Sequence, residues 1–307
     1  MQDKLEEPYW DLLLDRIKDG ECTPFLGAGA CGGVLPLGAD IACRWAEEEG
    51  YPLDDCTDLA RVAQFLAVKY DPMYPKGKLI RQFRNAVPPD FANPYEPHRL
   101  LADLPLPVYI TTNYDDFLFQ ALSRAEYAPG FKKNPVREVC RWNKYIRNRL
   151  KGRPTLLKQA GYSKINERSP VIFHLHGHAE FAESIVLTED DYLDFLVNIS
   201  KDEDLVPPRI QEAMAGTSLL FLGYRLNDWN FRVLFRNVVG YLGKSIARTH
   251  ISVQLVPVKK GTPDEQKRKA QEYLQRYFGD LKIQVYWGNA SDFAKELRDR
   301  WDKYKGR

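Results

Sequence analysis

The stretch VYITTNYDD, residues 108–116, decides the fold. Three apolar residues lead directly into the polar signature TTNYDD, from Thr111 to Asp116. The pattern recurs downstream, where VIF at 171–173 leads into HLHGH, from His174 to His178. Polar side chains directly after buried strands are typical of the carboxyl ends of parallel strands, where doubly wound α/β proteins bind their ligands.

Strand and helix patterns alternate on both sides of these signatures. An amphipathic helix, Tyr9–Ile17, leads into the first of six expected strands: Thr23–Leu26, Val108–Thr111, Val171–Leu175, Ser218–Tyr224, His250–Val256 and Lys282–Trp287. Helical patterns separate them, including Asp115–Leu122, Thr188–Leu196, Asp264–Phe278 and Ser291–Trp301. The alternation predicts an α/β fold, a Rossmann-like doubly wound parallel sheet. We expect one domain, 1–307, with a helical insertion at 40–105, a basic helical insertion at 127–168, and a proline-rich surface segment at 87–107.

Composition limits the class of protein. The chain has 307 residues, of which 44% are hydrophobic and 28% charged, as in ordinary globular proteins. No apolar run reaches the roughly 18 residues of a membrane span, and the acidic start lacks the order of a secretion signal. We therefore expect a cytoplasmic protein without a membrane partner. Five scattered cysteines without a CxxC pair argue against a disulfide framework and a zinc ribbon, so most are expected to be small buried hydrophobes.

Residues 131–168 are strongly basic, with twelve Lys or Arg against two acids. The rest of the chain is therefore net acidic, since the formal net charge is +2. A solvated helical face explains the pattern, because Trp142, Tyr145 and Ile146 interleave the charges at packing positions. A docking surface for an acidic partner, for nucleic acid or for ligand phosphates is the alternative.

A glycine turn, FLGAGA, follows the first strand at residues 25–30. Gly27, Ala28 and Gly29 would let backbone N–H groups approach a pyrophosphate at the start of a helix. Glycines after strands also serve chain geometry alone. The turn therefore supports a phosphate site only together with the other signatures.

The polar signatures offer candidate catalytic groups. Asn113 can donate and accept hydrogen bonds together, which suits a ribose hydroxyl or a water molecule, although an Asx turn is the alternative. Asp115 and Asp116 stand where a helix cap would also place them.

His176 precedes Gly177 at a strand end, which favours a catalytic base. His174 and His176 would face the same side of a regular strand. A metal bound by His174, His176 and His178 is disfavoured, because no nearby Cys or carboxylate completes a set of ligands.

GAGA, TTNYD, HLHG and FLGYRLND, in this order and spacing, resemble the sirtuin superfamily, and most closely its sirtuin-like branch in bacterial anti-phage defence systems. The resemblance runs from about Phe25 to Asp228. It implies a Rossmann-type NAD site with the pyrophosphate at the glycine turn, Asn113 and Asp115 beside the nicotinamide ribose, and His176 as the base. Thr112, Gly223, Tyr224 and Asp228 would complete the NAD site, although helix capping also explains Asp228.

The chain departs from the protein-deacylase branch of that superfamily. It lacks the four-cysteine zinc module, so no zinc or other metal is expected, and Cys31 stands where that branch commonly has Ser. The resemblance therefore implies an NAD glycohydrolase that releases nicotinamide and ADP-ribose in anti-phage defence. The alternatives are an NAD-dependent protein deacylase and a non-catalytic NAD-binding scaffold. Expected partners are further copies of the chain, a HerA-type ATPase, a short Argonaute or another sensor, with nucleic acid contacted only indirectly.

Overall fold

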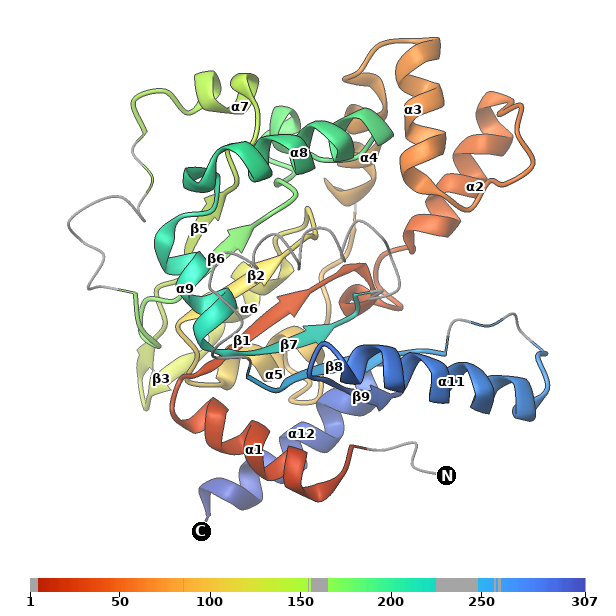
Figure 1. The fold of residues 1–307 in the computed structure, drawn as a ribbon. Coiled ribbons are helices and arrows are strands. Elements are labelled where there is room, and N and C mark those ends of the chain that lie inside the picture. Colours follow the sequence, from red (N-terminus) through yellow and green to blue (C-terminus); the bar gives the residue numbers. More distant parts are fainter. Residues whose placement is uncertain are drawn as a thin grey trace.

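Seven parallel strands form the central sheet of the protein (Figure 1). The computed structural model describes residues 5–84, 86–153, 155, 165–224, 248–256, 258 and 261–306. Across the sheet the strands run in the order β5 (Val136–Val139), β6 (Val171–His174), β2 (Val108–Thr111), β1 (Cys22–Leu26), β7 (Ser218–Leu222), β8 (His250–Gln254) and β9 (Ile283–Trp287). Each strand pairs in parallel with its neighbours.

The strand order confirms the Rossmann-like fold. Taken in chain order, β6-β2-β1-β7-β8-β9 is the 3-2-1-4-5-6 arrangement of dinucleotide-binding sheets, with β5 added beyond β6. Chain direction across the sheet reverses between β1 and β7, which is the topological switch point. In such folds ligands bind at the carboxyl ends of the strands beside this point.

Helices cover both faces of the sheet, because its strands are apolar on both sides. One face packs against α1 (Glu7–Lys18), α5 (Pro97–Asp103), α6 (Phe117–Arg124) and α12 (Ala290–Lys305). The other packs against α8 (Glu189–Lys201), α9 (Pro208–Gly216) and α11 (Asp264–Gly279). The sheet thus separates two distinct hydrophobic clusters, one on each of its faces.

A third hydrophobic cluster lies beside the sheet. It joins α2 (Gly38–Glu49), α3 (Leu59–Lys69) and α4 (Tyr74–Arg84) to Ile185 and Leu187, which directly precede α8. Figure 1 shows these three helices grouped near the start of α8. The helical part of the proposed insertion at 40–105 therefore packs against a later segment of the chain.

The stretch expected to be a basic helical insertion, 127–168, differs from that expectation. It contains most of the hairpin β3 (Glu126–Ala128) and β4 (Phe131–Lys132), then β5, and its described helix is the short α7 (Lys144–Arg149). β5 belongs to the central sheet, where Val136 pairs with Val171. Its Arg137 and Glu138 break up the apolar run that identified the other strands.

Two further expectations were wrong. The segment 87–107 does not simply wrap the surface, because α5 lies within it and buries Leu100 and Leu101. The disulfide Cys43–Cys56 joins α2 to the loop before α3. An odd cysteine count excludes complete pairing but leaves room for one bridge. Cys22, Cys31 and Cys140 are free and buried, as expected.

Among the residues that the structure describes, no helix combines the length and the apolar character needed to cross a membrane.

Candidate active site

The glycine turn joins β1 to a short 3-10 helix, η1 (Ala28–Cys31), and packs against the end of β7. The Gly27 N–H donates to the Leu222 carbonyl at 3.0 Å, and the Gly29 N–H donates to the Gly223 carbonyl at 2.9 Å. A Cβ on Gly27 would lie 2.7 Å from the Gly223 oxygen. The glycines therefore allow backbone to contact backbone at the switch point. Their predicted contact with a pyrophosphate stays a prediction, and these two N–H groups already have partners.

Asn113 ties the end of β2 to the glycine turn. Its side-chain NH₂ donates to the Gly27 carbonyl at 3.2 Å and to the Cys31 Sγ at 3.4 Å. Thr112 strengthens the connection, because its N–H and its hydroxyl both donate to the Leu26 carbonyl. With an exposed fraction of 9%, Asn113 is held in place across two strand ends. Its amide group thus makes long-range contacts beyond any local turn.

The two carboxylate oxygens of Asp115 accept hydrogen bonds from two different elements, α6 and η1. Its Oδ1 accepts the N–H of Phe117, the first residue of α6, at 3.0 Å. Its Oδ2 accepts the Cys31 Sγ–H at 3.4 Å. The N-cap residue of α6 is Asp116, which makes no side-chain capping bond, so Asp115 contacts the helix from the position before the cap. Burial, and then the charge of Asp115, raise the pKa of the Cys31 thiol well above its ordinary value.

His98 and Glu96 also lie beside Cys31 and Asp115, and neither was predicted from the sequence to be a site residue. His98 on α5 places Nε2 3.7 Å from the Cys31 Sγ, and its Nδ1 lies 2.7 Å from the Glu96 Oε1. His98 is 1% exposed. The signal available in the sequence was Glu96-Pro97-His98, a helix start followed by a histidine in a segment otherwise assigned to the surface.

His176 lies beyond the end of β6 and is covered by α8. Its ring packs edge-on against Tyr192 and Phe195, with ring centroids 5.4 and 5.1 Å apart. The residue is 4% exposed, and burial lowers the pKa of its imidazole to about 3. At neutral pH the ring is uncharged, and while it stays buried it is a weak base.

His174 and His176 do not face the same side, contrary to expectation. β6 ends at His174, and Gly177 adopts a φ of +94°, so the regular alternation stops before His176. His174 instead places Nδ1 3.2 Å from the Asn113 carbonyl, and its ring lies 4.6 Å from that of His178. Burial, and then the nearby His178, lower the pKa of His174 to about 3.

His178 lies between the His174 ring and the partly exposed carboxylate of Asp116. Its Nδ1 accepts the Glu180 N–H, so the ring proton belongs on Nε2, which lies 3.6 Å from the Asp116 carboxylate. Asp116 also pairs with Arg137 of β5 at 2.9 Å. Burial acts to raise the pKa of Asp116, but His178 and Arg137 outweigh it and lower that pKa.

Gly223 and Tyr224 stand at the end of β7. Gly223 has a φ of +71°, and a Cβ there would lie 2.0 Å from the Ala30 nitrogen. The Tyr224 ring lies edge-on to Phe25 at 5.4 Å. Both residues thus border the glycine turn, and their place in the NAD site stays a prediction. Asp228 and the helix expected after it lie outside the described residues.

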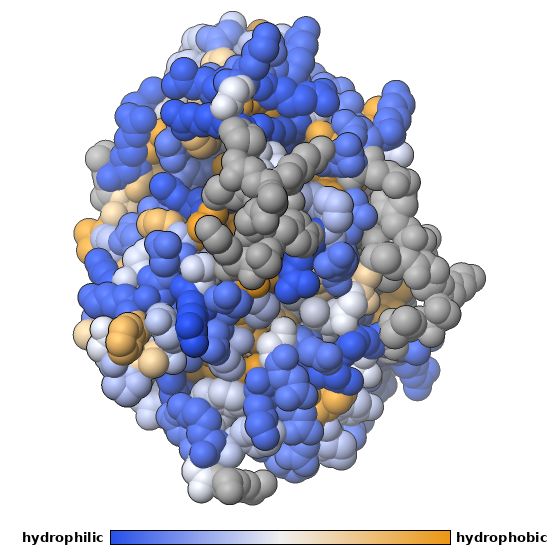
Figure 2. Space-filling model, turned by 90° about the vertical axis from the view of Figure 1, so that its left-hand side faces the viewer, coloured by the Kyte–Doolittle hydropathy of each residue, from blue (hydrophilic) through white to orange (hydrophobic). Residues whose placement is uncertain are grey.

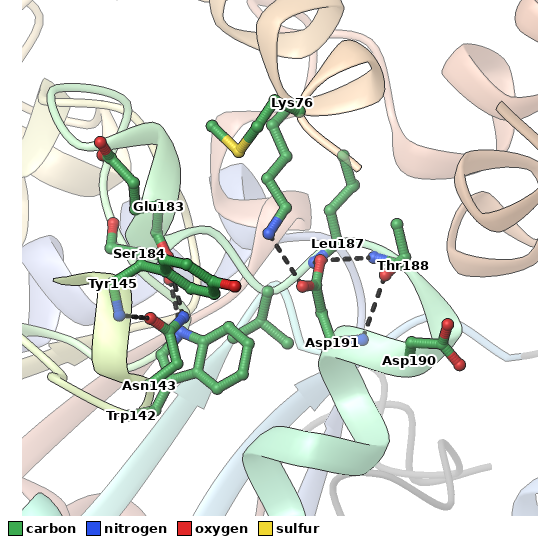
Figure 3. A network of polar contacts seen from close by, with 12 residues as sticks. Lys76, Trp142, Asn143, Tyr145, Glu183, Ser184, Leu187, Thr188, Asp190 and Asp191 are labelled. Carbon is green, nitrogen blue, oxygen red and sulfur yellow. Dashed lines mark hydrogen bonds and ion pairs between the residues drawn. The ribbon is translucent and has the colours of Figure 1, made fainter. Parts of the chain in front are cut away.

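A buried ion pair fixes the start of α8 (Figure 3). The Lys76 ammonium of α4 lies 2.8 Å from the Asp191 Oδ1. Asp191 Oδ2 accepts the N–H groups of Leu187 and Thr188, and the Thr188 hydroxyl accepts the Asp191 N–H. This capping box confirms the helix start predicted at Thr188.

The loop between His176 and α8 is anchored from the other side as well. The Trp142 indole N–H donates to the Ser184 carbonyl at 2.8 Å, and the Asn143 side chain donates to the Glu183 carbonyl at 2.9 Å (Figure 3). The Val186 N–H closes the loop by donating to the His176 carbonyl. The cover over His176, formed by α8 and the loop before it, is thus bonded to several separate segments of the chain.

Comparison with known proteins places these residues in a family. Residues 107–280 match the family described as SIR2-like domain, a segment that includes Asn113, Asp115, His176 and Gly223. This segment is more than half of the chain.

Curated relatives carry the name NAD(+) hydrolase ThsA. The protein of Enterococcus faecium is 24% identical over 198 residues, which are 62% of this chain and 34% of that protein. The protein of Cytobacillus dafuensis is 24% identical over 242 residues, which are 78% of this chain and 42% of that protein. The chain thus spans less than half the length of these relatives. A solved structure described as "Structural Basis for the Mechanism and Regulation of Sir2 Enzymes" aligns over 99% of this chain and 100% of that one, with a TM-score of 0.41 and 11% identity.

Proposed function

The chain belongs to the SIR2-like domain family, and from this premise we propose that it is an NAD glycohydrolase that releases nicotinamide and ADP-ribose. One observation carries the proposal. Thr111 and His174 are partners in the parallel register of β2 and β6, and Asn113 and His176 each stand two residues beyond that pair. The two polar groups expected to act on NAD thus come from the carboxyl ends of adjacent strands, on the β1 side of the switch point.

The proposed chemistry is cleavage of the bond between nicotinamide and ribose. The transition state resembles an oxocarbenium ion, so fixed polar groups that stabilise developing positive charge lower its energy. Asn113, held by the glycine turn, would orient a ribose hydroxyl or the attacking water. His176 would accept the proton that this group loses once Tyr192 and Phe195 have moved, because the burial that lowers its pKa to about 3 is then relieved. Such general-base help contributes on the order of 10²–10⁴-fold.

The five cysteines favour hydrolysis over protein deacylation. Cys43 and Cys56 form a disulfide, and the other three are buried singly. These positions leave no four-cysteine zinc module of the deacylase type. Water is therefore the acceptor that we propose for the ADP-ribosyl group.

We further propose that the activity serves anti-phage defence by depleting NAD, and that a trigger controls it. The cover over His176 supports this control, because Tyr192 and Phe195 must move before the imidazole meets a substrate. The trigger would act through another copy of the chain or through a partner such as a HerA-type ATPase, a short Argonaute or another sensor.

The decisive experiment measures nicotinamide release. Purified wild type, His176→Ala and Asn113→Ala would be incubated with NAD, and each protein would also be expressed in bacteria and followed for NAD content during phage infection. We expect release or depletion with wild type, and at least a 100-fold slower reaction with either variant. Equal NAD levels for wild type and His176→Ala in both assays would refute the proposal. Formation of acyl-ADP-ribose that depends on an acylated peptide would support the deacylase, and NAD binding without turnover would support the scaffold.

The basic stretch is the proposed contact region for a partner. Lys144, Arg147 and Arg149 of α7 are exposed, and Figure 2 shows that the face on this side of the molecule is largely hydrophilic. Arg147 pairs with Asp202 at 3.5 Å, so Lys144, Arg149 and Lys151 are better positions for charge reversal. Their replacement by Glu is expected to weaken activation during infection while leaving unfolding unchanged. Normal activation would rule out this contact.

A further inference from the structure

Cys31, His98 and Asp115 bring three different metal-ligating atoms together inside the protein. The ligand atoms all lie within 4.8 Å of one another. The Cys31 Sγ is 3.7 Å from the His98 Nε2 and 3.4 Å from the Asp115 Oδ2. In a tetrahedral zinc site, bond lengths of about 2.3 Å to sulfur and 2.0 Å to nitrogen or oxygen separate the ligand atoms by about 3.5 Å. The Cys31 Sγ is therefore already at ligand spacing from both His98 and Asp115.

The orientation of His98 is a second, independent indication. Its Nδ1 lies 2.7 Å from the Glu96 Oε1, and the other oxygen of Glu96 accepts the Arg99 N–H at 2.7 Å. The carboxylate thus favours a proton on Nδ1 and leaves the lone pair of Nε2 directed toward Cys31. Metal-binding histidines are commonly oriented by a carboxylate in this way.

The charges of the cluster also suit a divalent cation. Cys31 is 2% exposed, and both burial and Asp115 oppose formation of its thiolate. A cation with two positive charges would balance the Cys31 thiolate and the Asp115 carboxylate, which otherwise repel each other at this spacing. The thiol proton would leave to solvent on binding.

A cavity lies next to the chain segments that carry Cys31 and His98. Its volume is about 330 Å³, and Ala30, Gly32, Glu96 and Pro97 are among its lining residues. Ala30 and Gly32 flank Cys31, and Glu96 and Pro97 directly precede His98. A small hydrated ion can therefore approach the side of the molecule on which the cluster lies.

We propose that Cys31, His98 and Asp115 bind one Zn²⁺ ion, with Glu96 as a positioning residue. Thiolate and imidazole ligands favour zinc over magnesium or calcium, and three protein ligands leave a fourth position for water. The site differs from the four-cysteine zinc module, whose absence led us to expect no zinc. It does not depend on the proposed NAD hydrolysis, because ion binding is measured without NAD.

The test is metal titration of the full chain after treatment with a chelator, with Zn²⁺ by calorimetry and Co²⁺ as an optical probe. Cys140→Ser is the matched control, since Cys140 is also a buried free cysteine. We expect wild type and this control to bind one equivalent, with the absorption of a cobalt–thiolate bond. Cys31→Ser should lose that absorption and bind at least tenfold more weakly, and Glu96→Gln should bind about 10- to 100-fold more weakly.

The pH dependence gives a further readout. Release of one thiol proton should make the affinity fall about tenfold for each unit of decrease in pH. Lack of cobalt–thiolate absorption in the wild-type protein would overturn the proposal whether or not the variants fold. Equal zinc affinity of wild type and a folded Cys31→Ser variant would overturn it as well.

Discussion

The ends of β2 and β6 are neighbours in the sheet, but they hold their polar residues by different means. At the end of β2, Asn113 is fixed by hydrogen bonds to the Gly27 carbonyl and to Cys31. At the end of β6, His176 lies against the rings of Tyr192 and Phe195. The position of Asn113 therefore depends on backbone that belongs to the sheet, whereas the accessibility of His176 depends on where α8 lies.

This difference suggests where control acts. Hydrogen bonds between strand ends are preserved as long as the sheet is folded, so the Asn113 side is permanently organised. Helix α8 packs on the sheet through Phe195 and Ile199, but the ion pair and the capping box at its start can be weakened without unfolding the sheet. Substitutions around His176 and α8, the β6 side, should therefore leave the contacts of Asn113, the β2 side, unchanged.

Gly177→Ala should have the largest effect. Gly177 has a φ of +94°, and a Cβ would lie 2.2 Å from the Ser184 carbonyl oxygen and 2.7 Å from the Ile185 nitrogen. The loop that carries His176 would have to move, so we expect a loss of about 4 kcal/mol or more in the free energy of unfolding. Urea unfolding followed by circular dichroism measures this loss.

Gly130→Ala is the matched control. Gly130 also has a positive φ, +79°, but a Cβ there meets no atom within 4 Å. It should lose only about 1 kcal/mol from backbone strain. If both variants lost a similar free energy of unfolding, the loop at Gly177 could shift at little cost. Close packing would then not fix the position of His176.

How much of the fold could be predicted depends on how apolar each element is. Val108–Thr111 forms the strand expected from the sequence, because its apolar run is uninterrupted and buried. β5 was missed because Arg137 and Glu138 occupy half of an edge strand, where one side chain reaches out to pair with Asp116. Helix α5 was missed because prolines on both sides suggested a loop, although Pro97 is well placed in a first helical turn.

The site was predictable only where its residues follow a strand. Asn113 and His176 could be placed at strand ends from sequence, since strand ends collect ligand-binding residues. Cys31 and His98 are 67 positions apart, and only the packing of α5 on the sheet brings them together. The cover over His176 likewise depends on the tertiary packing of α8, which no local pattern specifies.

Lys76→Met should give the next largest loss in the free energy of unfolding. The Lys76 and Asp191 side chains are 6% and 14% exposed, so the substitution leaves a carboxylate nearly buried without its cation. Breaking a buried pair in this way costs about 3–5 kcal/mol, and the hydrogen bonds that remain on Asp191 place the expected loss near 3 kcal/mol. Hydrogen exchange should show faster opening of α8 than of β2.

Lys269→Met is the control for this ion pair. Lys269 and Glu265 are also 2.8 Å apart, but their side chains are 67% and 68% exposed. Loss of this surface pair should change the free energy of unfolding by less than about 0.5 kcal/mol. Equal protection of α8 in wild type and Lys76→Met would show that the ion pair does not hold the cover.

Acid should destabilise the protein through the buried histidines. Burial lowers the pKa of His176 from 6.5 to about 3, so the unfolded chain binds a proton more readily than the folded protein. The stability contributed by the neutral ring is therefore complete above pH 6.5 and falls as the pH decreases toward 3. At pH 5, His176 alone should account for a loss of about 2 kcal/mol relative to pH 7.

Urea unfolding of wild type and His176→Leu at pH 7 and pH 5 measures this contribution. Leucine keeps an apolar group beside Phe195 and removes the titrating ring. The difference between the two pH values should be about 2 kcal/mol smaller for the variant, although His174 continues to contribute in both proteins because its pKa is also lowered to about 3. An unchanged difference would mean that protonated His176 is already solvated in the folded state, and the contrast between the two strand ends would disappear.

Thr188→Ala should have the smallest effect, and it tests the cover most selectively. The Thr188 hydroxyl accepts the Asp191 N–H at 3.1 Å, and the Asp191 carboxylate accepts the Thr188 N–H at 3.0 Å. Loss of an N-cap side chain costs about 1 kcal/mol, and Thr188→Ser should restore most of it because the hydroxyl is kept. We expect exchange of the first amides of α8 to accelerate about fivefold in the alanine variant, while the Thr112 amide, which is bonded to Leu26, exchanges as in wild type. Equal acceleration at both places would show that the ends of β2 and β6 open together, so that α8 could not uncover His176 while Asn113 stays in place.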